Sequence, residues 1–217
     1  GIHGSLYLNR IQSVLPEAKI LIIVRDPVSA IISAYADYMD RAIGLCRFSD
    51  FIKPIKSNQV PRFSIGYYRY IDLIKSYDKA FGRDNVIVVP FELIRKSALD
   101  FIRPIYSAIG IAMPEKIPAN ERINSRDYRR LAILERWPLF NILGPKSHAN
   151  GSGALGWTKL HRLTMQLNRL VSNKAAEDYR EHLKKMVTDS YLDYLINGNR
   201  ELQARLNMNL RELGYLT

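Results

Sequence analysis

An arginine and a serine near the start of the chain have the residue types and the spacing of an anion-binding pair. Arg25 comes directly after a run of apolar residues, and Ser33 follows it by eight positions. A guanidinium can hold a phosphate through two parallel hydrogen bonds, and a hydroxyl can donate a further one. If both side chains face the same space, the chemistry they predict is the binding of one phosphate group.

Two elements have to position this pair. The apolar, β-branched run over residues 19–24 is typical of a strand buried on both faces. Asp26 is a favoured N-cap and Pro27 a favoured first helical residue, so we expect a helix over residues 27–43. Ligands of open parallel sheets bind beyond the carboxyl ends of the strands, and the amino end of a helix attracts anions. Arg25 would therefore emerge where an anion is favoured.

A second interpretation of these residues stays open. Arg25 can instead pair with Asp26 or another acidic residue, and Ser33 can be a small residue where a helix packs on the sheet. Spacing alone does not choose between an anion site and a structural ion pair.

The rest of the chain predicts an α/β fold whose second half is helical. Apolar positions recur at helical spacing over residues 66–81, and a second buried-strand run covers residues 86–91. Two such strands, joined by a long helical crossover, should be parallel with a right-handed connection. Further helices are predicted at residues 6–14, 98–109, 125–136 and 157–213, the last with breaks at Gly198 and Gly214.

The small number of strands predicts that part of the sheet is missing. Only two convincing strand runs occur, and because both are apolar on both faces, each needs neighbouring strands and covering helices. The chain also begins at Gly1 rather than at a methionine. We therefore expect one incomplete domain over residues 1–217, with its N-terminal strands upstream of Gly1.

The segment around Arg25 resembles the 3′-phosphate-binding segment of sulfotransferases. In that family, a strand-end arginine and a serine eight residues later bind the 3′-phosphate of 3′-phosphoadenosine 5′-phosphosulfate, the sulfate donor. The resemblance implies a parallel sheet of the P-loop NTPase-like type, a nucleotide co-substrate held by Arg25 and Ser33, and sulfuryl transfer to a hydroxyl or amine, with carbohydrates as one acceptor class. It is carried by Leu15-Pro16-Glu17-Ala18-Lys19-Ile20, Ile23-Val24-Arg25-Asp26-Pro27, Ser33-Ala34-Tyr35, Gly66-Tyr67-Tyr68 and Val89-Pro90-Phe91-Glu92-Leu93.

Weaker similarity implies further site residues. The family often has an aromatic-Glu pair at the end of the later strand, and Phe91 occupies the position of the aromatic ring that can lie against the adenine. The stretch after this strand often carries an asparagine and basic residues near the nucleotide, which implies roles for Asn124 and Arg126. His3 precedes Arg25 by 22 residues, close to the spacing of the catalytic histidine of cytosolic members, and is the candidate base.

Some features depart from the family or have a plainer interpretation. Sulfotransferases hold the 5′-phosphosulfate in a P-loop-like turn near the N-terminus, and residues 144–147 lack the earlier glycine that such an amide cradle needs. We therefore expect this fragment alone to be inactive. His3 can be incidental near a chain end, and the segment with Asn124 and Arg126 can be a solvated helix start.

Composition narrows the partners without identifying them. The chain has 32 Lys and Arg against 21 Asp and Glu, a net charge of +11, and both halves share the excess. A diffuse positive field favours anions in general. No apolar run approaches the roughly 20 residues that cross a bilayer, and no metal-ligand spacing occurs. Because Cys46 is the single cysteine, we expect the cytoplasm, or the Golgi lumen if an anchor lies upstream.

Two rival functions remain at this stage. A P-loop-fold kinase relative would have a Walker lysine upstream and would depend on Mg²⁺. A non-enzymatic basic module would bind a polyanion with strong salt dependence and without competition by nucleotide. The even spread of charge favours a nucleotide or a small acceptor over nucleic acid.

Overall fold

The computed structural model describes residues 2–40, 47–53, 63–114 and 171–217. The chain divides into two units, the first made of residues 1–27, 65–122 and 191–217 and the second of residues 28–64 and 123–190. The first unit contains the sheet, and the second contains an aromatic core. One domain over residues 1–217 stays a prediction.

The two apolar runs of the sequence form a parallel pair of strands. β1 spans Ile20–Val24 and β2 spans Val86–Pro90, and the register pairs the first residues of both strands and the last residues of both strands. The predicted parallel pairing is confirmed. Because the two strands are paired along their whole length and run in the same direction, the residues that follow them emerge at the same edge of the sheet.

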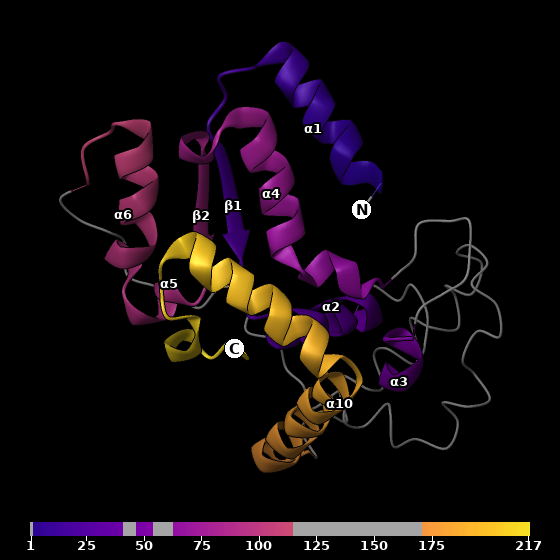
Figure 1. Ribbon diagram of the computed structural model, residues 1–217. Helices are drawn as coiled ribbons and strands as arrows, with labels where there is room; N and C mark the ends of the chain where they lie inside the picture. The colour runs from indigo at the N-terminus through magenta and orange to yellow at the C-terminus, as the bar shows by residue number, and fades with distance from the viewer. Residues whose placement is uncertain (1, 41–46, 54–62, 115–170) are drawn as a thin grey trace. The chain divides into compact units, whose positions relative to one another are not determined.

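Helices of the first unit flank this pair (Figure 1). α1 covers Ile2–Val14 and packs on α4, Tyr70–Phe81, which lies beside β1. After β2 come α5, Leu93–Lys96, and α6, Ala98–Ile109. The 98–109 prediction is confirmed, whereas the predicted helix over residues 66–81 is split into a 3-10 helix, Ile65–Tyr68, and α4. The 125–136 prediction lies outside the described residues.

Local signals explain why α6 starts and stops where it does. The Ser97 hydroxyl oxygen accepts a hydrogen bond from the Asp100 N–H, which satisfies one of the free amides of the first turn. Gly110 ends the helix in the left-handed conformation at φ 71°, where any residue with a Cβ is strained. Both are properties of a few neighbouring residues, which is why the sequence predicts these bounds.

Apolar side chains cover one face of the strand pair at both of its ends. At the amino end, Leu8, Phe81 and Val86 are buried together, with Ile20 packed against them. At the carboxyl end a second cluster gathers around buried residues of β1, α4 and the C-terminal segment, namely Val24, Ile74, Leu202, Leu210 and Tyr215. This second cluster fixes the edge of the sheet from which Arg25 emerges.

The prediction that β1 is buried on both faces is wrong in the described structure. Its burial alternates, and Leu21 and Ile23 are 43% and 50% exposed. Among the described residues β1 pairs with β2 alone, so nothing described there covers the face that carries these two side chains. Strands upstream of Gly1 stay a prediction.

The long C-terminal helix bends at a place the sequence does not indicate. α10 spans Asn173–Leu206, and its one non-helical residue is Tyr191, at φ −139° and ψ 16°. The predicted break at Gly198 is wrong, because the helix continues through it. A Cβ at Gly198 would lie 3.0 Å from Cγ of Arg69, so the glycine instead allows a close approach of that side chain. Gly214 does end a 3-10 helix, Leu210–Leu213, at φ 91°.

An ion pair links the part of α10 after the bend to α4. Nε of Arg205 donates to Oδ2 of Asp78 at 2.7 Å and Nη2 donates to Oδ1 at 2.9 Å. Such a two-pronged ion pair is geometrically specific. Both side chains are largely buried, at 15% and 19% exposed, and they hold the last helical turns of α10 beside the sheet.

The second unit has an aromatic core. α2, Pro27–Asp40, begins at the predicted proline, and α3 spans Phe48–Phe51. The ring of Tyr35 meets those of Phe48 and Phe51 at centroid distances of 5.0 and 5.3 Å, and Phe63 joins Phe51 at 5.6 Å. Edge and tilted contacts of this kind add to the burial of the rings.

Candidate functional site

Two predicted site residues meet where the parallel strands end. Arg25 follows β1 and Phe91 follows β2. The Phe91 N–H donates to the Val24 carbonyl at 2.7 Å, so the strand pairing continues to this point. The Arg25 guanidinium carbon lies 5.6 Å from the centroid of the Phe91 ring, a cation–π contact.

The Arg25 guanidinium has no acidic partner in the described part of the chain. None of the ion pairs formed there includes Arg25. The interpretation of Arg25 as half of a structural ion pair is therefore not supported by the described residues. An aromatic face neither neutralises a guanidinium nor uses its hydrogen-bond donors, so the contact with Phe91 leaves those donors unused.

A buried carboxylate lies directly after Phe91. Glu92 is 9% exposed, and each of its oxygens accepts a hydrogen bond. The backbone N–H of Asp26 donates to Oε1 at 2.9 Å, and the phenol of Tyr215 donates to Oε2 at 2.8 Å. Buried carboxylates are tolerated where donors replace lost water, and Glu92 has such donors on both oxygens.

Three tyrosines in this unit keep their protons well above neutral pH. Burial raises the pKa of Tyr68 to about 12. Burial, and then the charge of Glu92, raises the pKa of Tyr215. The pKa of Tyr70 is also raised, by burial first and then by Tyr68, Asp26 and Glu92, whereas Arg25 opposes this shift. All three phenols are hydrogen-bond donors at neutral pH.

The other predicted site residues are not brought to this edge by the described structure. Ser33 is half-buried on α2 in the second unit, so its pairing with Arg25 stays a prediction. His3 lies in α1, where only the backbone is described. Asn124 and Arg126 lie outside the described residues.

Sequence reasoning missed the role of Glu92 and all of Tyr215. The signal for Glu92 was present, because it stands beside Phe91 at the strand end, yet its type alone does not show that it is buried. Tyr215 lies 123 positions from Glu92, and nothing local to it indicates a site. Tyr70 falls within the helix predicted over residues 66–81, and its helical spacing gives no sign of a site.

Neither a metal cluster nor a membrane helix occurs in the described stretches. No group of three or more His, Cys, Asp or Glu residues there is placed to hold a metal ion. None of the described helices has the length and apolar character needed to cross a bilayer.

Comparison with known proteins agrees with the geometry at the strand ends. The model of the sulfotransferase family matches residues 4–115, which include β1, Arg25, β2 and Glu92. Searches among curated proteins and among solved structures returned no significant match. The match covers just over half of the 217 residues. The chemistry of the matched family is sulfuryl transfer. The chain therefore belongs to the sulfotransferase family.

Proposed function

We propose that the chain binds 3′-phosphoadenosine 5′-phosphosulfate through Arg25 at the 3′-phosphate and takes part in sulfuryl transfer to a hydroxyl or amine, with carbohydrates as one acceptor class. The observation that carries this is the Arg25 guanidinium, which leaves the carboxyl edge of a parallel strand pair without a described acidic partner. Guanidinium is the group best suited to a two-pronged bond with phosphate.

The other predicted contacts complete the proposal for the nucleotide. Ser33 would donate to the same phosphate, and Asn124 and Arg126 would lie near the nucleotide. One face of the Phe91 ring receives the Arg25 guanidinium. An adenine stacked on Phe91 would therefore use the opposite face, unless Arg25 moves on binding.

The transfer itself would be an in-line displacement. The acceptor oxygen or nitrogen forms a bond to sulfur while the bond from sulfur to the bridging phosphate oxygen breaks, and adenosine 3′,5′-bisphosphate leaves. A base, for which His3 is the candidate, takes the acceptor proton. Fixed positive groups stabilise the charge on the transferring oxygens. Arg25 would serve the nucleoside end of the donor and would not act on the transferring group itself.

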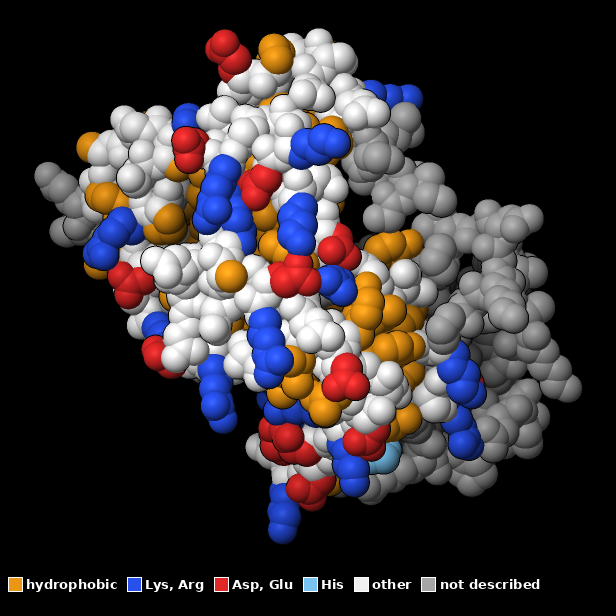
Figure 2. Space-filling model, in the orientation of Figure 1, with side chains coloured by type: hydrophobic (Ala, Val, Ile, Leu, Met, Phe, Trp, Pro, Cys, Tyr) orange, Lys and Arg blue, Asp and Glu red, His pale blue; other side chains and the backbone are white. Residues whose placement is uncertain are grey.

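The surface charge supports a small anionic ligand over a polyanion. On the face shown in Figure 2, Lys and Arg side chains are interspersed with Asp and Glu. Polyanion binding modules instead gather their cations into a patch or stripe.

Calorimetry with adenosine 3′,5′-bisphosphate tests the proposal. Arg25→Ala should weaken binding by roughly 1.5–3 kcal/mol, because a charge-assisted hydrogen-bond partner is lost. Arg103→Ala is the matched control, because it removes the same charge elsewhere. Arg103 is exposed on α6, and its one ion pair among the described residues is with Asp100 at 3.4 Å.

The outcome also separates the rival functions. Equal affinity in wild type and Arg25→Ala would contradict the assignment of Arg25. Binding that requires Mg²⁺ would favour a kinase relative. If Arg25→Ala and Arg103→Ala lost the same affinity, and if high salt removed both losses, a module that binds anions by charge alone would be favoured.

A further inference from the structure

Hydrogen bonds hold the backbone on both sides of Arg25. The Val24 carbonyl accepts from the Phe91 N–H at 2.7 Å, and the Asp26 N–H donates to Oε1 of Glu92 at 2.9 Å. Both partners directly follow β2. The torsions that direct the Arg25 side chain lie between these two anchors, so the bonds limit where the guanidinium can go.

The second anchor depends on a residue from the C-terminal segment. Tyr215 donates its phenolic hydrogen to Oε2 of Glu92 at 2.8 Å, and the two side chains are 2% and 9% exposed. When one of its donors is removed, a buried carboxylate lowers its free energy by rotating toward water or by taking up a proton. Tyr215 thus keeps Oε1 of Glu92 aimed at the Asp26 N–H.

Tyr215 is itself held in place. Its N–H donates to the Leu210 carbonyl at 3.2 Å, across the left-handed turn at Gly214. Its ring is buried with Val24 and Leu202 in the apolar cluster at the carboxyl end of the strands. A rigid phenol on a packed turn can fix the rotamer of a neighbouring carboxylate.

We infer that Tyr215 is a positioning residue for nucleotide binding: by holding Glu92, it fixes the backbone from which Arg25 reaches the donor's 3′-phosphate. The inference rests on the proposed function and deepens it. Tyr215 acts through Glu92 and need not touch the nucleotide.

The test compares two nucleotides that differ by the 3′-phosphate. Calorimetry on the full chain gives the Kd of adenosine 3′,5′-bisphosphate and that of adenosine 5′-phosphate. Tyr215→Phe should weaken binding of the bisphosphate by about threefold to tenfold and leave the Kd of the monophosphate unchanged. Partial unfolding weakens both by the same factor, so the ratio of the two Kd values reports positioning alone.

Tyr77→Phe is the matched control. Tyr77 lies in the same unit, where its ring stacks on Phe81 at 6.0 Å in the cluster at the amino end of the strands. It also loses one hydroxyl, and the ratio should stay at the wild-type value.

A double mutant shows whether Tyr215 acts through Arg25. The Tyr215→Phe change should cost nothing more once Arg25 is alanine. The inference is overturned if Tyr215→Phe leaves the ratio unchanged, or if it costs the same factor with and without Arg25.

Substitutions at Glu92 give a second test that does not use Tyr215→Phe, and the Kd of the monophosphate reports whether each variant is folded. Glu92→Gln keeps an oxygen that can accept from the Asp26 N–H, whereas Glu92→Met has a similar length and no such acceptor. The Kd of the bisphosphate relative to that of the monophosphate should rise in Glu92→Met and stay close to the wild-type value in Glu92→Gln. Equal ratios in both variants would refute the inference.

Failure of the inference is distinguishable from failure of the proposed function. If Arg25→Ala weakens the bisphosphate and Tyr215→Phe does not, Arg25 keeps its role and Tyr215 loses its own. If wild type and Arg25→Ala do not differ, the proposed function is contradicted.

Discussion

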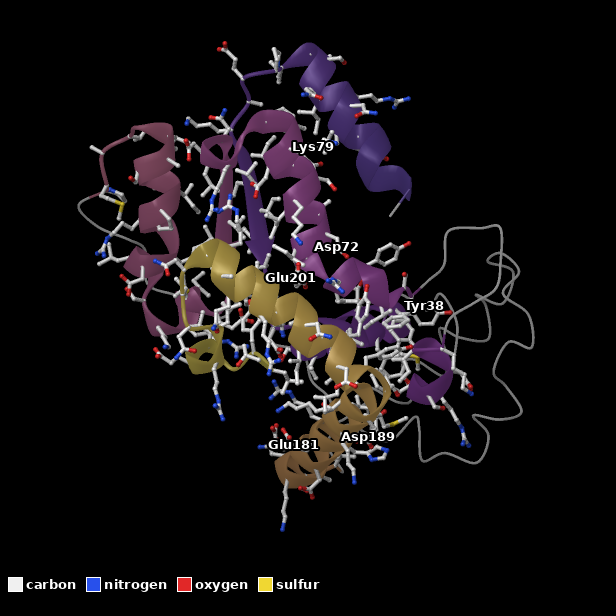
Figure 3. The ribbon with its side chains drawn as sticks, in the orientation of Figure 1. Tyr38, Asp72, Lys79, Glu181, Asp189 and Glu201 are labelled. Atoms are coloured by element: carbon white, nitrogen blue, oxygen red, sulfur yellow. The ribbon has the colours of Figure 1, made fainter. Side chains whose placement is uncertain are left out.

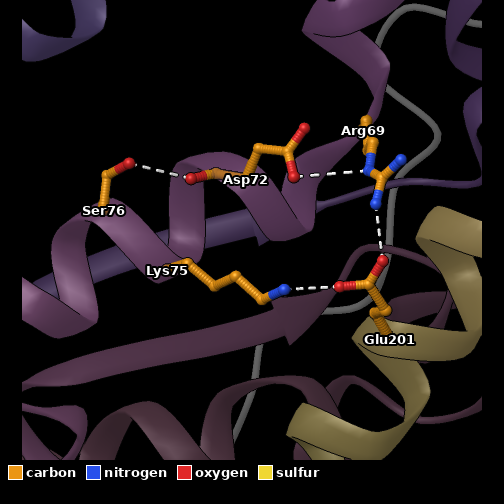
Figure 4. A network of polar contacts seen from close by, with 5 residues as sticks. All are labelled: Arg69, Asp72, Lys75, Ser76 and Glu201. Atoms are coloured by element: carbon orange, nitrogen blue, oxygen red, sulfur yellow. Dashed lines mark hydrogen bonds and ion pairs between the residues drawn. The ribbon is translucent and has the colours of Figure 1, made fainter.

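Two polar networks of the first unit are each centred on a glutamate carboxylate, but the two carboxylates lie in different surroundings. Around Glu92, a buried carboxylate accepts one backbone and one phenolic hydrogen bond. Around Glu201, a carboxylate that is 36% exposed accepts from Arg69 and Lys75. Figure 3 shows Glu201 on α10 beside Asp72 on α4, and Figure 4 shows the contacts that join them through Arg69.

The difference lies in what water can replace. When an exposed partner is lost, solvent takes its place, so such pairs contribute little. When a buried partner is lost, the remaining groups stay without solvent, and the cost is their desolvation. The Glu92 network should therefore govern stability and site geometry, and the Glu201 network should only support the docking of α10.

The largest expected effect is the loss of the Glu92 carboxylate. Glu92→Met removes the acceptor of both the Asp26 N–H and the Tyr215 phenol, and should lower the free energy of unfolding by about 3 kcal/mol. Urea denaturation followed by circular dichroism measures this. Glu92→Gln, the control, should lose clearly less, and an equal loss in both would show that the hydrogen bonds do not matter.

An intermediate effect is expected in alkali. The folded pKa of Tyr215 is raised above its ordinary value of 10.0, so its contribution is fully present below that value and is lost as pH rises through the folded pKa. Between the ordinary pKa and the folded pKa, each such tyrosine lowers the free energy of unfolding by about 1.4 kcal/mol per pH unit.

Tyr215→Phe should therefore reduce the slope of stability against pH above 10.0 by one proton. Urea melts across this range measure the slope. Tyr77→Phe serves as the reference, and a slope as steep in Tyr215→Phe as in wild type would speak against a perturbed Tyr215.

The smallest effect on stability is expected from loss of the Glu201 carboxylate. Unlike the effect of Tyr215, it should depend on pH in the acid range. The hydrogen bond from Lys75 lowers the pKa of Glu201 below its ordinary value of 4.5, so its contribution is present above that value and is lost as pH falls through the folded pKa. Glu201→Gln should lower Tm less than Glu92→Met at neutral pH, and the difference from wild type should vanish in acid.

Salt sharpens this last prediction. The Glu201 effect should shrink in high salt, whereas the Glu92 effect should not, because only exposed charges are well screened. Glu177→Gln is the control, because its partner Arg180 lies within the same helix at 3.4 Å. A Glu201 effect as large as that of Glu92, insensitive to salt, would remove the distinction between the networks.

Part of the site was predictable and part was not. Arg25 and Phe91 could be placed at one edge because each directly follows an apolar run, and in-register parallel strands bring such residues together. The burial of β1 could not be predicted from the sequence, because an apolar residue such as Ile23 is buried only if another part of the protein covers it. The bend at Tyr191 likewise has no local breaker residue.

The sequence by itself determined the elements whose causes are local. Apolar runs made β1 and β2, α2 began at Pro27, and Ser97 and Gly110 bounded α6. Only the tertiary structure decided that Glu92 would join the Asp26 amide, 66 positions away, to the Tyr215 phenol, 123 positions away. Caps and periodicity act over a few residues, whereas the donors of a buried carboxylate are chosen by whatever packing of the whole chain brings beside it.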